Sequence, residues 1–285
     1  MSKTIVITGA SDGIGAALAK RLKDKGNNVA IVGRSKVKTA AVAAELAVPS
    51  YLADFAKLSD VRALAADLER DYPRIDVLIN NAGTWFDEYA LTEDGFERTM
   101  QVNHLAPALL TELLLPTLTR AEGEPPSIAQ WTTSMSSRWV GKLDAARIGV
   151  DDEIARARYK NMRVYGTAKL ACSVYVAEFE RRHTQDGIAA VSVHPGMVAT
   201  SFGTNSDSSR KGGSLFQKFM TKYILTTPDG SAARLQHFAE GIPGTDWIPG
   251  DYYQGKRHYK HAQVADLALG VAVWNRTREL LQLAN

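Results

Sequence analysis

Tyr165 and Lys169, four residues apart, are the side chains of this chain whose chemistry and spacing fit each other best. They lie in a segment predicted to be helical, where a separation of four puts both side chains on one face. A phenol ionises near pH 10, and a neighbouring ammonium group stabilises the phenolate and lowers its pKa. Such a tyrosine can exchange a proton with a substrate as a general acid or base. Because inert surface helices also carry this pair, it needs support from the rest of the sequence.

A glycine-rich turn, Thr8–Gly15, follows directly on the apolar run Thr4–Ile7. Gly9 lets the chain turn tightly off the strand, while Gly13 and Gly15 let the backbone approach phosphate oxygens and let the next helix pack against the sheet. That helix presents unpaired N–H groups and the positive end of its dipole to an anion. A flexible loop is the alternative, but the strand before the turn and the helix after it favour a pyrophosphate site.

The end of the second predicted strand, Gly33-Arg34-Ser35, indicates which dinucleotide binds. Folds that accept NAD usually place an acidic residue here for the ribose 2′-hydroxyl, whereas an arginine suits the 2′-phosphate of NADP. Gly33 stands in the place of that acid and Arg34 follows it. Arg34 could also be a plain surface charge, but the missing acid and the added cation agree. NADP(H) is therefore predicted, with NAD(H) as the alternative.

Short β-branched runs alternate with helical periodicity, which predicts a single-domain α/β fold of the Rossmann type. Its sheet is expected to be doubly wound and mainly parallel, with helices on both faces. Seven strands are predicted, at Thr4–Thr8, Asn28–Gly33, Ser50–Ala53, Asp76–Asn80, Ile128–Thr133, Ile188–His194 and Asp251–Gln254. The predicted helices are Gly13–Lys25, Lys36–Leu46, Leu58–Tyr72, Phe96–Leu118 and Met162–Arg182.

One catalytic domain over residues 1–285 is expected, because neither repeats nor a low-complexity linker divides the chain. Two segments, 138–161 and 201–226, interrupt the regular alternation of strands and helices. Long loops in compact α/β domains are functional more often than idle, so we expect both to be insertions on the substrate side.

Composition describes an ordinary globular protein, with 45% hydrophobic and 23% charged residues. A net charge of +3 is too small, and its cations too dispersed, for a nucleic-acid partner. The lone Cys172 excludes an internal disulfide and a cysteine-built metal site, and no metal site is predicted. No apolar stretch approaches the roughly 20 residues of a membrane span, and no signal peptide is visible. We therefore expect a cytoplasmic protein that acts on a small molecule.

These features occur together with further stretches, in an order that covers most of the chain. The stretches are Asp54, Asn80-Asn81-Ala82-Gly83, Asn103, a serine at the end of a strand, and His194–Thr200. The combination resembles the classical short-chain dehydrogenase/reductase family. The tail, with Thr227–Ala233, Gly250–Tyr253 and Ala265–Trp274, is similar to the retinol-dehydrogenase-like branch of that family, as is Val102–Leu105.

The resemblance implies a role for each matching residue. Tyr165 would be the general acid when a carbonyl is reduced, and the base in the reverse reaction. Lys169 would hold the nicotinamide ribose and depress the tyrosine pKa, and the strand-end serine would hydrogen-bond the substrate oxygen. Asn103 would interrupt its helix and hold a water through which the proton is replenished. The implied catalytic set is Asn103, Ser134, Tyr165 and Lys169.

The cofactor would lie along the carboxyl ends of the strands. Asp54 would touch the adenine, and the segment around Asn80 would border the adenosine. The turn after Pro195-Gly196 would meet the nicotinamide carboxamide. The implied contacts are Gly9, Ser11, Asp12, Gly13, Ile14, Gly15, Arg34, Ser35, Asp54, Phe55, Asn80, Ala82, Gly83, Tyr165, Lys169, Pro195, Gly196, Val198 and Thr200.

Two departures from the family pattern bear on the site. The segment Thr132–Ser137 offers Thr133, Ser134 or Ser136 as the catalytic hydroxyl, and the count back from Arg138-Trp139 favours Ser134. Asp12 stands where many NADP-preferring relatives have a basic residue, which weakens the NADP prediction slightly. His194 beside Pro195 is interpreted as structural rather than as an acid or base.

The leading hypothesis is an NADPH-dependent reductase of ketones or aldehydes, or the same enzyme run in reverse. The alternatives are an NAD-dependent alcohol dehydrogenase and a non-catalytic NADP-binding regulatory protein. Trp85, Trp139 and Met197, with apolar residues of 201–226, suggest a bulky hydrophobic substrate, although they could simply pack the loops. A homodimer through the helix of Tyr165 is common in the family, but this branch also contains monomers.

Overall fold

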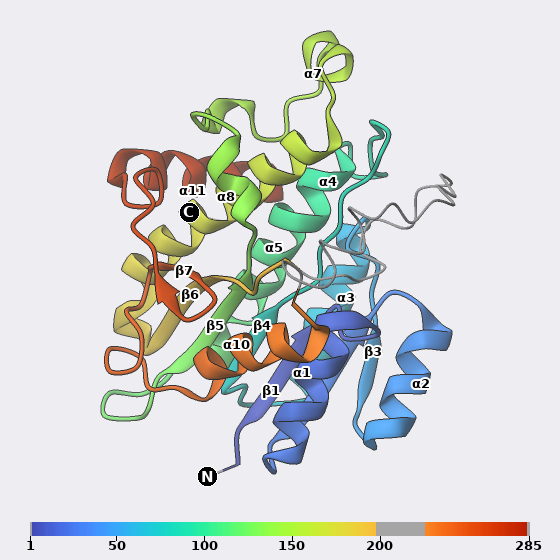
Figure 1. The fold of residues 1–285 in the computed structure, drawn as a ribbon, viewed down its shortest axis with the longest axis vertical. Helices are drawn as coiled ribbons and strands as arrows, with labels where there is room; N and C mark the ends of the chain where they lie inside the picture. The colour runs from blue at the N-terminus through green and yellow to red at the C-terminus, as the bar shows by residue number, and fades with distance from the viewer. Residues whose placement is uncertain (1, 198–225, 284–285) are drawn as a thin grey trace.

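An eight-stranded sheet forms the centre of the computed structural model, which describes residues 2–197 and 226–283. The strand order is β3-β2-β1-β4-β5-β6-β7-β8, and every neighbouring pair is parallel except β7 with β8 (Figure 1). The strands are β1 Thr4–Thr8, β2 Asn28–Gly33, β3 Ser50–Leu52, β4 Val77–Asn80, β5 Ser127–Thr132, β6 Ile188–His194, β7 Tyr252–Gln254 and β8 Arg257–His258.

The predicted Rossmann-type class is confirmed, but the prediction of seven strands is wrong by one. The added strand β8 pairs antiparallel with β7 across the two-residue loop Gly255-Lys256, in which Gly255 has φ +60°. A short hairpin turn needs such a positive φ, which glycine adopts without strain. Because β8 has only two residues and no apolar run, hydrophobic periodicity carries no signal for it.

Helices cover both faces of the sheet, and the strands divide their side chains between two cores. On β1, Val6 faces one core, while Ile5 and Ile7 face the other, as the period of two requires. The Val6 face is covered by α3, α5, α8 and α11, and the opposite face by α1, α2 and α10. The main helices are α1 Gly13–Asp24, α2 Lys36–Leu46, α3 Leu58–Asp71, α5 Ala106–Leu113, α8 Asn161–His183, α10 Pro228–Glu240 and α11 Leu267–Leu281.

The continuous helix predicted for Phe96–Leu118 is instead four short pieces. They are α4 Arg98–Met100, the π-helical turn η1 Gln101–Leu105, α5, and α6 Leu115–Leu118. Inside η1, the Asn103 side chain donates to the carbonyl of Thr99 at 2.7 Å. A π-turn inserted into a helix frequently marks a functional site.

The segment 138–161 makes three short helical turns before α8 begins. The first, η2 Met135–Trp139, follows β5 directly, and η3 Ala145–Arg147 and α7 Glu153–Ala157 come after it. Asp152 caps α7 by accepting from the Ala155 N–H at 2.7 Å. Figure 1 shows α7 projecting from the end of the molecule, beyond the sheet. A last short turn, η4 Thr184–Asp186, joins α8 to β6.

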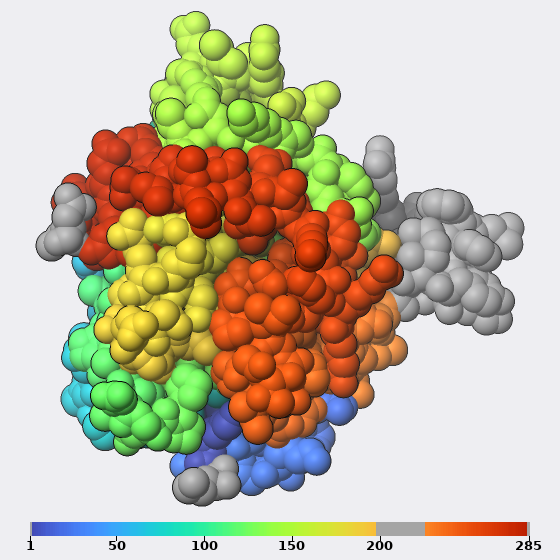
Figure 2. Space-filling model, turned by 90° about the vertical axis from the view of Figure 1, so that its left-hand side faces the viewer, coloured from blue at the N-terminus to red at the C-terminus, as the bar shows by residue number. Residues whose placement is uncertain are grey.

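Two long helices, α10 and α11, were absent from the predicted elements. Each begins at a side-chain cap: Thr227 accepts from the Gly230 N–H with Pro228 at the first position, and Asp266 accepts from the Leu269 N–H. Helix α11 packs across α8, where the Trp274 ring stacks on Tyr175 at 5.0 Å and 13°. Figure 2 shows α11 in red lying over the yellow end of α8. The face of α8 that packs against α11 is used within the chain. A homodimer through α8 stays a prediction.

Trp274 is expected to be a principal stabilising contact of α11, because only 5% of its surface is exposed. Trp274→Ala should lower the free energy of unfolding by about 3–5 kcal/mol. Leu267→Ala on the same helix is the control, since 63% of Leu267 is exposed, and it should change stability by about 0.5 kcal/mol or less. Urea unfolding monitored by circular dichroism measures both, and an equal loss for the two variants would contradict this packing.

Candidate active site

The glycine turn after β1 is closed against the end of β4. A Cβ on Gly9, whose φ is +66°, would lie 2.7 Å from the Cα of Ala82, and one on Gly15 would lie 2.3 Å from the Gly9 carbonyl oxygen. No side chain fits at either position. Asp12 caps α1 by accepting from the Gly13 N–H at 2.7 Å, and the first-turn N–H groups of Ile14 and Gly15 belong to the end of the helix that is left without intrahelical partners.

Thr8 and Asn81 fasten this turn to the segment after β4. The Thr8 hydroxyl accepts from the N–H groups of Asn81 and Ala82, both at 3.0 Å. The Asn81 amide donates back to the carbonyls of Thr8 and Gly9 at 3.0 and 3.2 Å. Asn80 faces away, because its buried amide donates to Thr111 of α5 at 2.9 Å. Asn80 therefore supports the sheet with its side chain, and Asn81, which the predicted set omits, positions the turn.

The end of β2 leaves no room for an acid. A Cβ on Gly33 would lie 2.2 Å from the Thr39 hydroxyl oxygen and 2.8 Å from the Cβ of Ser11. The next residue, Arg34, is exposed. Ser35 caps α2 by accepting from the Lys38 N–H at 3.4 Å.

Asp54 and Phe55 shape the turn after β3. The Asp54 carboxylate accepts from the Ala56 N–H at 3.0 Å, and its own N–H donates to Asp60 at 3.0 Å. Phe55 is 5% exposed and belongs to the core, with its carbonyl accepting from Gln101. The Phe55 side chain is therefore a packing residue.

Asn103, Lys169 and Gly83 meet at one buried point. The Asn103 amide donates to the carbonyls of Thr84 and Thr99 at 2.6 and 2.7 Å. A Cβ on Gly83 would lie 2.6 Å from the Asn103 Oδ1 atom and 2.9 Å from the Lys169 Nζ atom. In the described residues, this Asn103 oxygen is buried without a hydrogen-bond partner. A buried acceptor beside an ammonium group is therefore left for a donor that the chain itself does not supply.

Three hydroxyls compete at the end of β5, and the geometry separates them. Ser134 hydrogen-bonds the Tyr165 side chain and also accepts from the Ser136 hydroxyl at 2.9 Å. Thr133 points into α8, where its hydroxyl contacts Ser173 at 2.9 Å and the Lys169 carbonyl at 3.2 Å. Of the three, Ser134 is therefore the hydroxyl joined to Tyr165, with Ser136 behind it.

Burial controls the ionisation of the Tyr165–Lys169 pair. The pKa of Tyr165 is raised, chiefly because the phenol is buried, while its hydrogen bond with Ser134 acts in the opposite direction. The pKa of Lys169 is lowered by burial. Its ammonium group donates to the Thr132 carbonyl at 3.0 Å and lies 5.9 Å from the Tyr165 ring centroid. Burial thus raises the pKa of Tyr165, in place of the depression expected from Lys169, and the phenol holds its proton.

The three side chains predicted to line the substrate site differ in their surroundings. The Trp85 ring meets the Tyr165 ring edge-on at 5.7 Å. Trp139 and Met197 are 70% and 37% exposed, so neither is required by the core. Val198 and Thr200, and the segment 201–226 except its last residue, lie outside the described residues.

Helix α10 secures the turn after β6. The Pro195 carbonyl accepts from Ser231 at 3.0 Å and from the Arg234 guanidinium at 2.7 Å. Gly196 has φ +103°, and a Cβ there would lie 2.0 Å from the same guanidinium. Arg234 is absent from the predicted set, because one arginine in a helix gives no sequence signal. His194 is 8% exposed and burial lowers its pKa to about 4, which agrees with a structural role.

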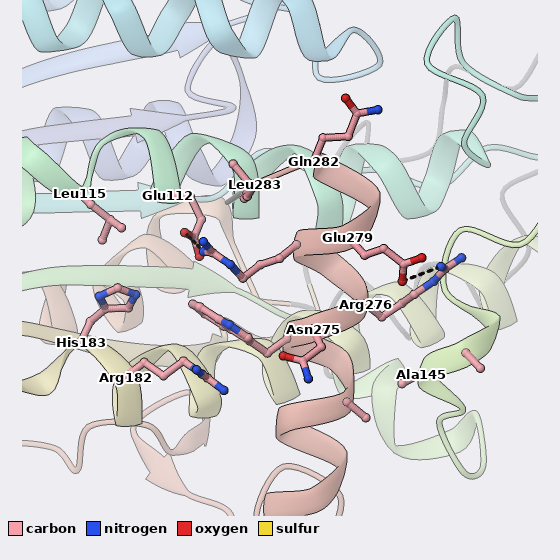
Figure 3. A pocket seen from close by; sticks show the side chains of 14 residues that line it. Glu112, Leu115, Ala145, Arg182, His183, Asn275, Arg276, Glu279, Gln282 and Leu283 are labelled. Carbon is pink, nitrogen blue, oxygen red and sulfur yellow. Dashed lines mark hydrogen bonds and ion pairs between the residues drawn. The ribbon is translucent and has the colours of Figure 1, made fainter. Parts of the chain in front are cut away.

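A surface hollow between α5, α8 and α11 lies elsewhere (Figure 3). Its lining includes His183, eighteen residues beyond Tyr165 and so roughly 27 Å along α8. Glu112 accepts from Tyr175 at 2.6 Å and pairs with Arg278, and Arg276 pairs with Glu279. The Glu112–Arg278 pair joins α11 to α5, and the hollow is separate from the candidate active site.

The residues of the glycine turn and around Lys169 fit a nicotinamide dinucleotide. Gly9 and Gly15 keep the turn at the helix end free of side chains, and the buried Asn103 oxygen beside Lys169 needs an outside donor. In the same described ranges, 2–197 and 226–283, no group of three or more His, Cys, Asp or Glu is arranged to hold a metal ion. Within those ranges, no helix combines the length and the apolarity needed to cross a membrane.

Comparisons with known proteins identify the family of this chain. The family model described as short chain dehydrogenase matches residues 3–138. DnrU of Streptomyces sp. (strain C5), named as a daunorubicin C-13 ketoreductase, is 34% identical over 95% of this chain and 90% of its own. Retinol dehydrogenase 12 of Mus musculus is 31% identical over 98% of this chain and 86% of its own.

The chain belongs to the short-chain dehydrogenase family. The retinol dehydrogenases among its relatives place it in the retinol-dehydrogenase-like branch of the classical short-chain enzymes. A crystal structure from Mycobacterium paratuberculosis has a TM-score of 0.75 and 28% identity, covering 99% of this chain and 94% of that one. A Burkholderia cenocepacia short chain dehydrogenase in complex with NADP has a TM-score of 0.67 and 23% identity, covering 88% and 95%, and shares the fold.

His104, next to Asn103 in this short-chain dehydrogenase, should make the fold sensitive to acid. Its Nε2 atom bonds the Thr277 hydroxyl at 2.8 Å, and burial, assisted by the charge of Lys169, lowers its pKa to about 3. The unfolded chain protonates this histidine near pH 6.5. Between these values the unfolded state binds the extra proton, so stability falls as pH falls below about 6.5, by at most about 1.4 kcal/mol per pH unit for this residue.

The change that tests this is His104→Gln, which keeps a polar group but removes the titration. Urea unfolding at pH 7 and pH 5 should show a smaller loss of stability for the variant than for the wild type. Equal losses in the two proteins would contradict the role of His104.

Proposed function

We propose that this enzyme reduces a ketone or aldehyde to an alcohol with NADPH, or catalyses the reverse reaction with NADP+. The observation that carries the proposal is the buried cluster in which Ser134 hydrogen-bonds Tyr165 while Lys169 and the Asn103 oxygen meet behind it. Polar groups are costly to bury without partners, so such a cluster is retained for chemistry more readily than for stability.

Tyr165 acts as the general acid in the reduction. Because burial raises its pKa, the phenol is protonated at neutral pH and can donate its proton to the oxygen of the substrate. Ser134 holds that oxygen through a hydrogen bond as negative charge develops on it. When bound, the nicotinamide cofactor supplies the hydride to the carbonyl carbon. Together with the proton from Tyr165, this hydride would convert the carbonyl to the alcohol.

Lys169 and Asn103 support the tyrosine from behind. Lys169 is held by the Thr132 carbonyl with its Nζ atom 5.9 Å from the Tyr165 ring centroid, and it would bind a ribose hydroxyl of the cofactor. The Asn103 oxygen is positioned by the π-turn to accept a hydrogen bond from a water that returns the proton to Tyr165. The ammonium group stabilises the phenolate that forms after the proton has left.

The NADP preference rests on the end of β2. Gly33 has no space for the acidic side chain that would bind a 2′-hydroxyl, and Arg34 stands exposed beside it. A guanidinium suits a phosphate through paired hydrogen bonds. The turn Gly9–Gly15 would hold the pyrophosphate, and the turn after Pro195 the nicotinamide side.

Three apolar side chains support a bulky, apolar substrate. Trp85 contacts the tyrosine ring, and Trp139 and Met197 expose apolar surface. One relative is named as a daunorubicin C-13 ketoreductase and another as a retinol dehydrogenase, and both names agree with a large hydrophobic substrate. A cytoplasmic location stays a prediction, with which the single buried Cys172 is compatible.

Tyr165→Phe should remove the proton donor while leaving cofactor binding intact. The turnover number on the best carbonyl substrate should fall by at least about 100-fold, and the dissociation constant of NADPH, measured by fluorescence, should change little. Tyr51→Phe is the control, because the Tyr51 hydroxyl bonds Asp71 at the surface, at 2.8 Å, away from the site. Retention of turnover by the Tyr165 variant would overturn the mechanism.

Arg34→Ala should weaken NADPH specifically. Losing a charge-assisted hydrogen bond of about 1.5–3 kcal/mol should raise the KM for NADPH about 10-fold to 100-fold. The KM for NADH should stay within about two-fold of the wild-type value. Steady-state assays at fixed ionic strength measure both, and an unchanged KM for NADPH would remove the basis for the preference.

A further inference from the structure

Trp85 lies in a loop whose backbone is held by side chains. The described residues 84–89 form neither helix nor strand, so the carbonyls of this loop need partners outside the regular elements. Three consecutive carbonyls accept from side chains: Thr84 from the Asn103 amide at 2.6 Å, Trp85 from the Thr84 hydroxyl at 3.2 Å, and Phe86 from the Tyr159 hydroxyl at 2.7 Å. The peptide groups on both sides of Trp85 are therefore fixed.

Tyr159 holds this loop from the segment that precedes α8. Its phenol has one proton, which it donates to the Phe86 carbonyl, so the Thr99 hydroxyl at 3.2 Å is the donor to Tyr159. Burial raises the pKa of Tyr159, and the phenol keeps that proton. The carbonyl of Thr99 accepts from Asn103 at 2.7 Å. Thr99, which is fully buried, thus links the side chain that holds Thr84 to the one that holds Phe86.

Two further hydrogen bonds join the same two segments, but not at the peptide groups beside Trp85. They run from the Tyr89 hydroxyl to Asp151, and from the Asn161 amide to Asp87 at 2.8 Å. Both fasten side chain to side chain. Tyr159, by contrast, acts on the backbone of the residue that follows Trp85.

The position of Trp85 bears on the reaction because its ring meets the proposed proton donor. The Trp85 and Tyr165 rings are 5.7 Å apart at 69°, the edge-to-face geometry that aromatic pairs favour. Trp85 is only half-buried, so part of its indole surface is left to contact another molecule. A small displacement of groups beside reacting atoms can lower the rate of a reaction strongly.

We propose that Tyr159 is a positioning residue for substrate selection, which holds the Phe86 carbonyl and thereby keeps the Trp85 ring in place as a wall for bulky, apolar carbonyl compounds. This inference rests on the proposed carbonyl reduction. Tyr159 acts through Trp85 and does not itself touch the substrate. The segment 138–161 thus has a defined role, and a small carbonyl compound that does not reach Trp85 is insensitive to Tyr159.

Tyr159→Phe tests this, since it keeps the ring and removes the hydroxyl. With NADPH, kcat/KM for the bulky ketone 2-acetylnaphthalene should fall about ten-fold, mainly through KM, and kcat/KM for propanal should stay within about two-fold. Tyr89→Phe is the matched control, because it removes a hydrogen bond between the same segments away from the Trp85 backbone; it should change neither value by more than about two-fold. In a protein that already carries Trp85→Leu, Tyr159→Phe should not change the ratio of the two values further.

The fluorescence of Trp85 provides a readout without turnover. Its contribution is the difference between each protein and the same protein carrying Trp85→Phe. Acrylamide should quench this contribution more strongly in Tyr159→Phe than in the wild type, because a loop that has lost a fixed hydrogen bond opens more readily. Tyr89→Phe should be quenched like the wild type.

The outcomes separate this inference from the proposed function. An unchanged ratio of the two kcat/KM values in Tyr159→Phe would overturn the role of Tyr159 and leave the proposed function intact. An equal loss in Tyr89→Phe, or a full effect of Tyr159→Phe in the Trp85→Leu protein, would overturn it as well. A wild type that reduces no carbonyl compound would overturn the proposed function and the selection role with it. Unchanged quenching in Tyr159→Phe would overturn the positioning of Trp85 in either case.

Discussion

The buried ammonium group of Lys169 constrains the residues and segments that pack around it. It is 3% exposed, donates to the Thr132 carbonyl, and in the described residues has no carboxylate as an ion-pair partner. Burial of an unpaired cation is costly, and here the cost is limited by a lowered pKa and by backbone dipoles. Gly83 is needed because any side chain there would occupy the same space. The end of β5, the segment after β4 and α8 are therefore fixed relative to one another by one side chain.

The π-turn η1 places Asn103 beside Lys169 and connects this cluster to helix α11. Asn103 bridges the Thr84 and Thr99 carbonyls, which fixes its free oxygen beside Lys169. The next residue, His104, bonds Thr277 of α11. The C-terminal helix thus supports the candidate active site through a direct hydrogen bond, in addition to its stacking on α8. In the proposed mechanism, a substrate oxygen that approaches Tyr165 would meet a site that is already assembled.

Much of this could be predicted because it depends on local sequence. The buried parallel strands appear as apolar runs, and their predicted bounds agree with the structure within about one residue. Tyr165 and Lys169 follow from helical spacing, and Gly9 from the turn after a strand. The family prediction is confirmed, whereas the roles of the individual site residues stay predictions.

The remaining features depend on contacts between distant segments. The π-turn forms where Asn103 bonds the carbonyls of Thr84 and Thr99, the first of which lies outside the helix, so periodicity alone predicts an unbroken helix. Ser134 is distinguished from Thr133 only by which of them faces Tyr165. The ion pair of Asp12 with Lys38, at 2.9 Å, joins the glycine turn to helix α2, twenty-six residues further along the chain. By contrast, the start of α10 had a readable signal, since Thr227 followed by Pro228 is a typical cap.

The central claim is that the buried Tyr165 cluster carries out hydride chemistry on a bulky carbonyl compound. The most direct measurement incubates the protein with NADPH deuterated at its transferable position and with carbonyl compounds graded by size and polarity. Mass spectrometry then follows the label. We expect deuterium on the carbinol carbon of the larger apolar substrates. A protein that binds NADPH but transfers no label to any of them would contradict it.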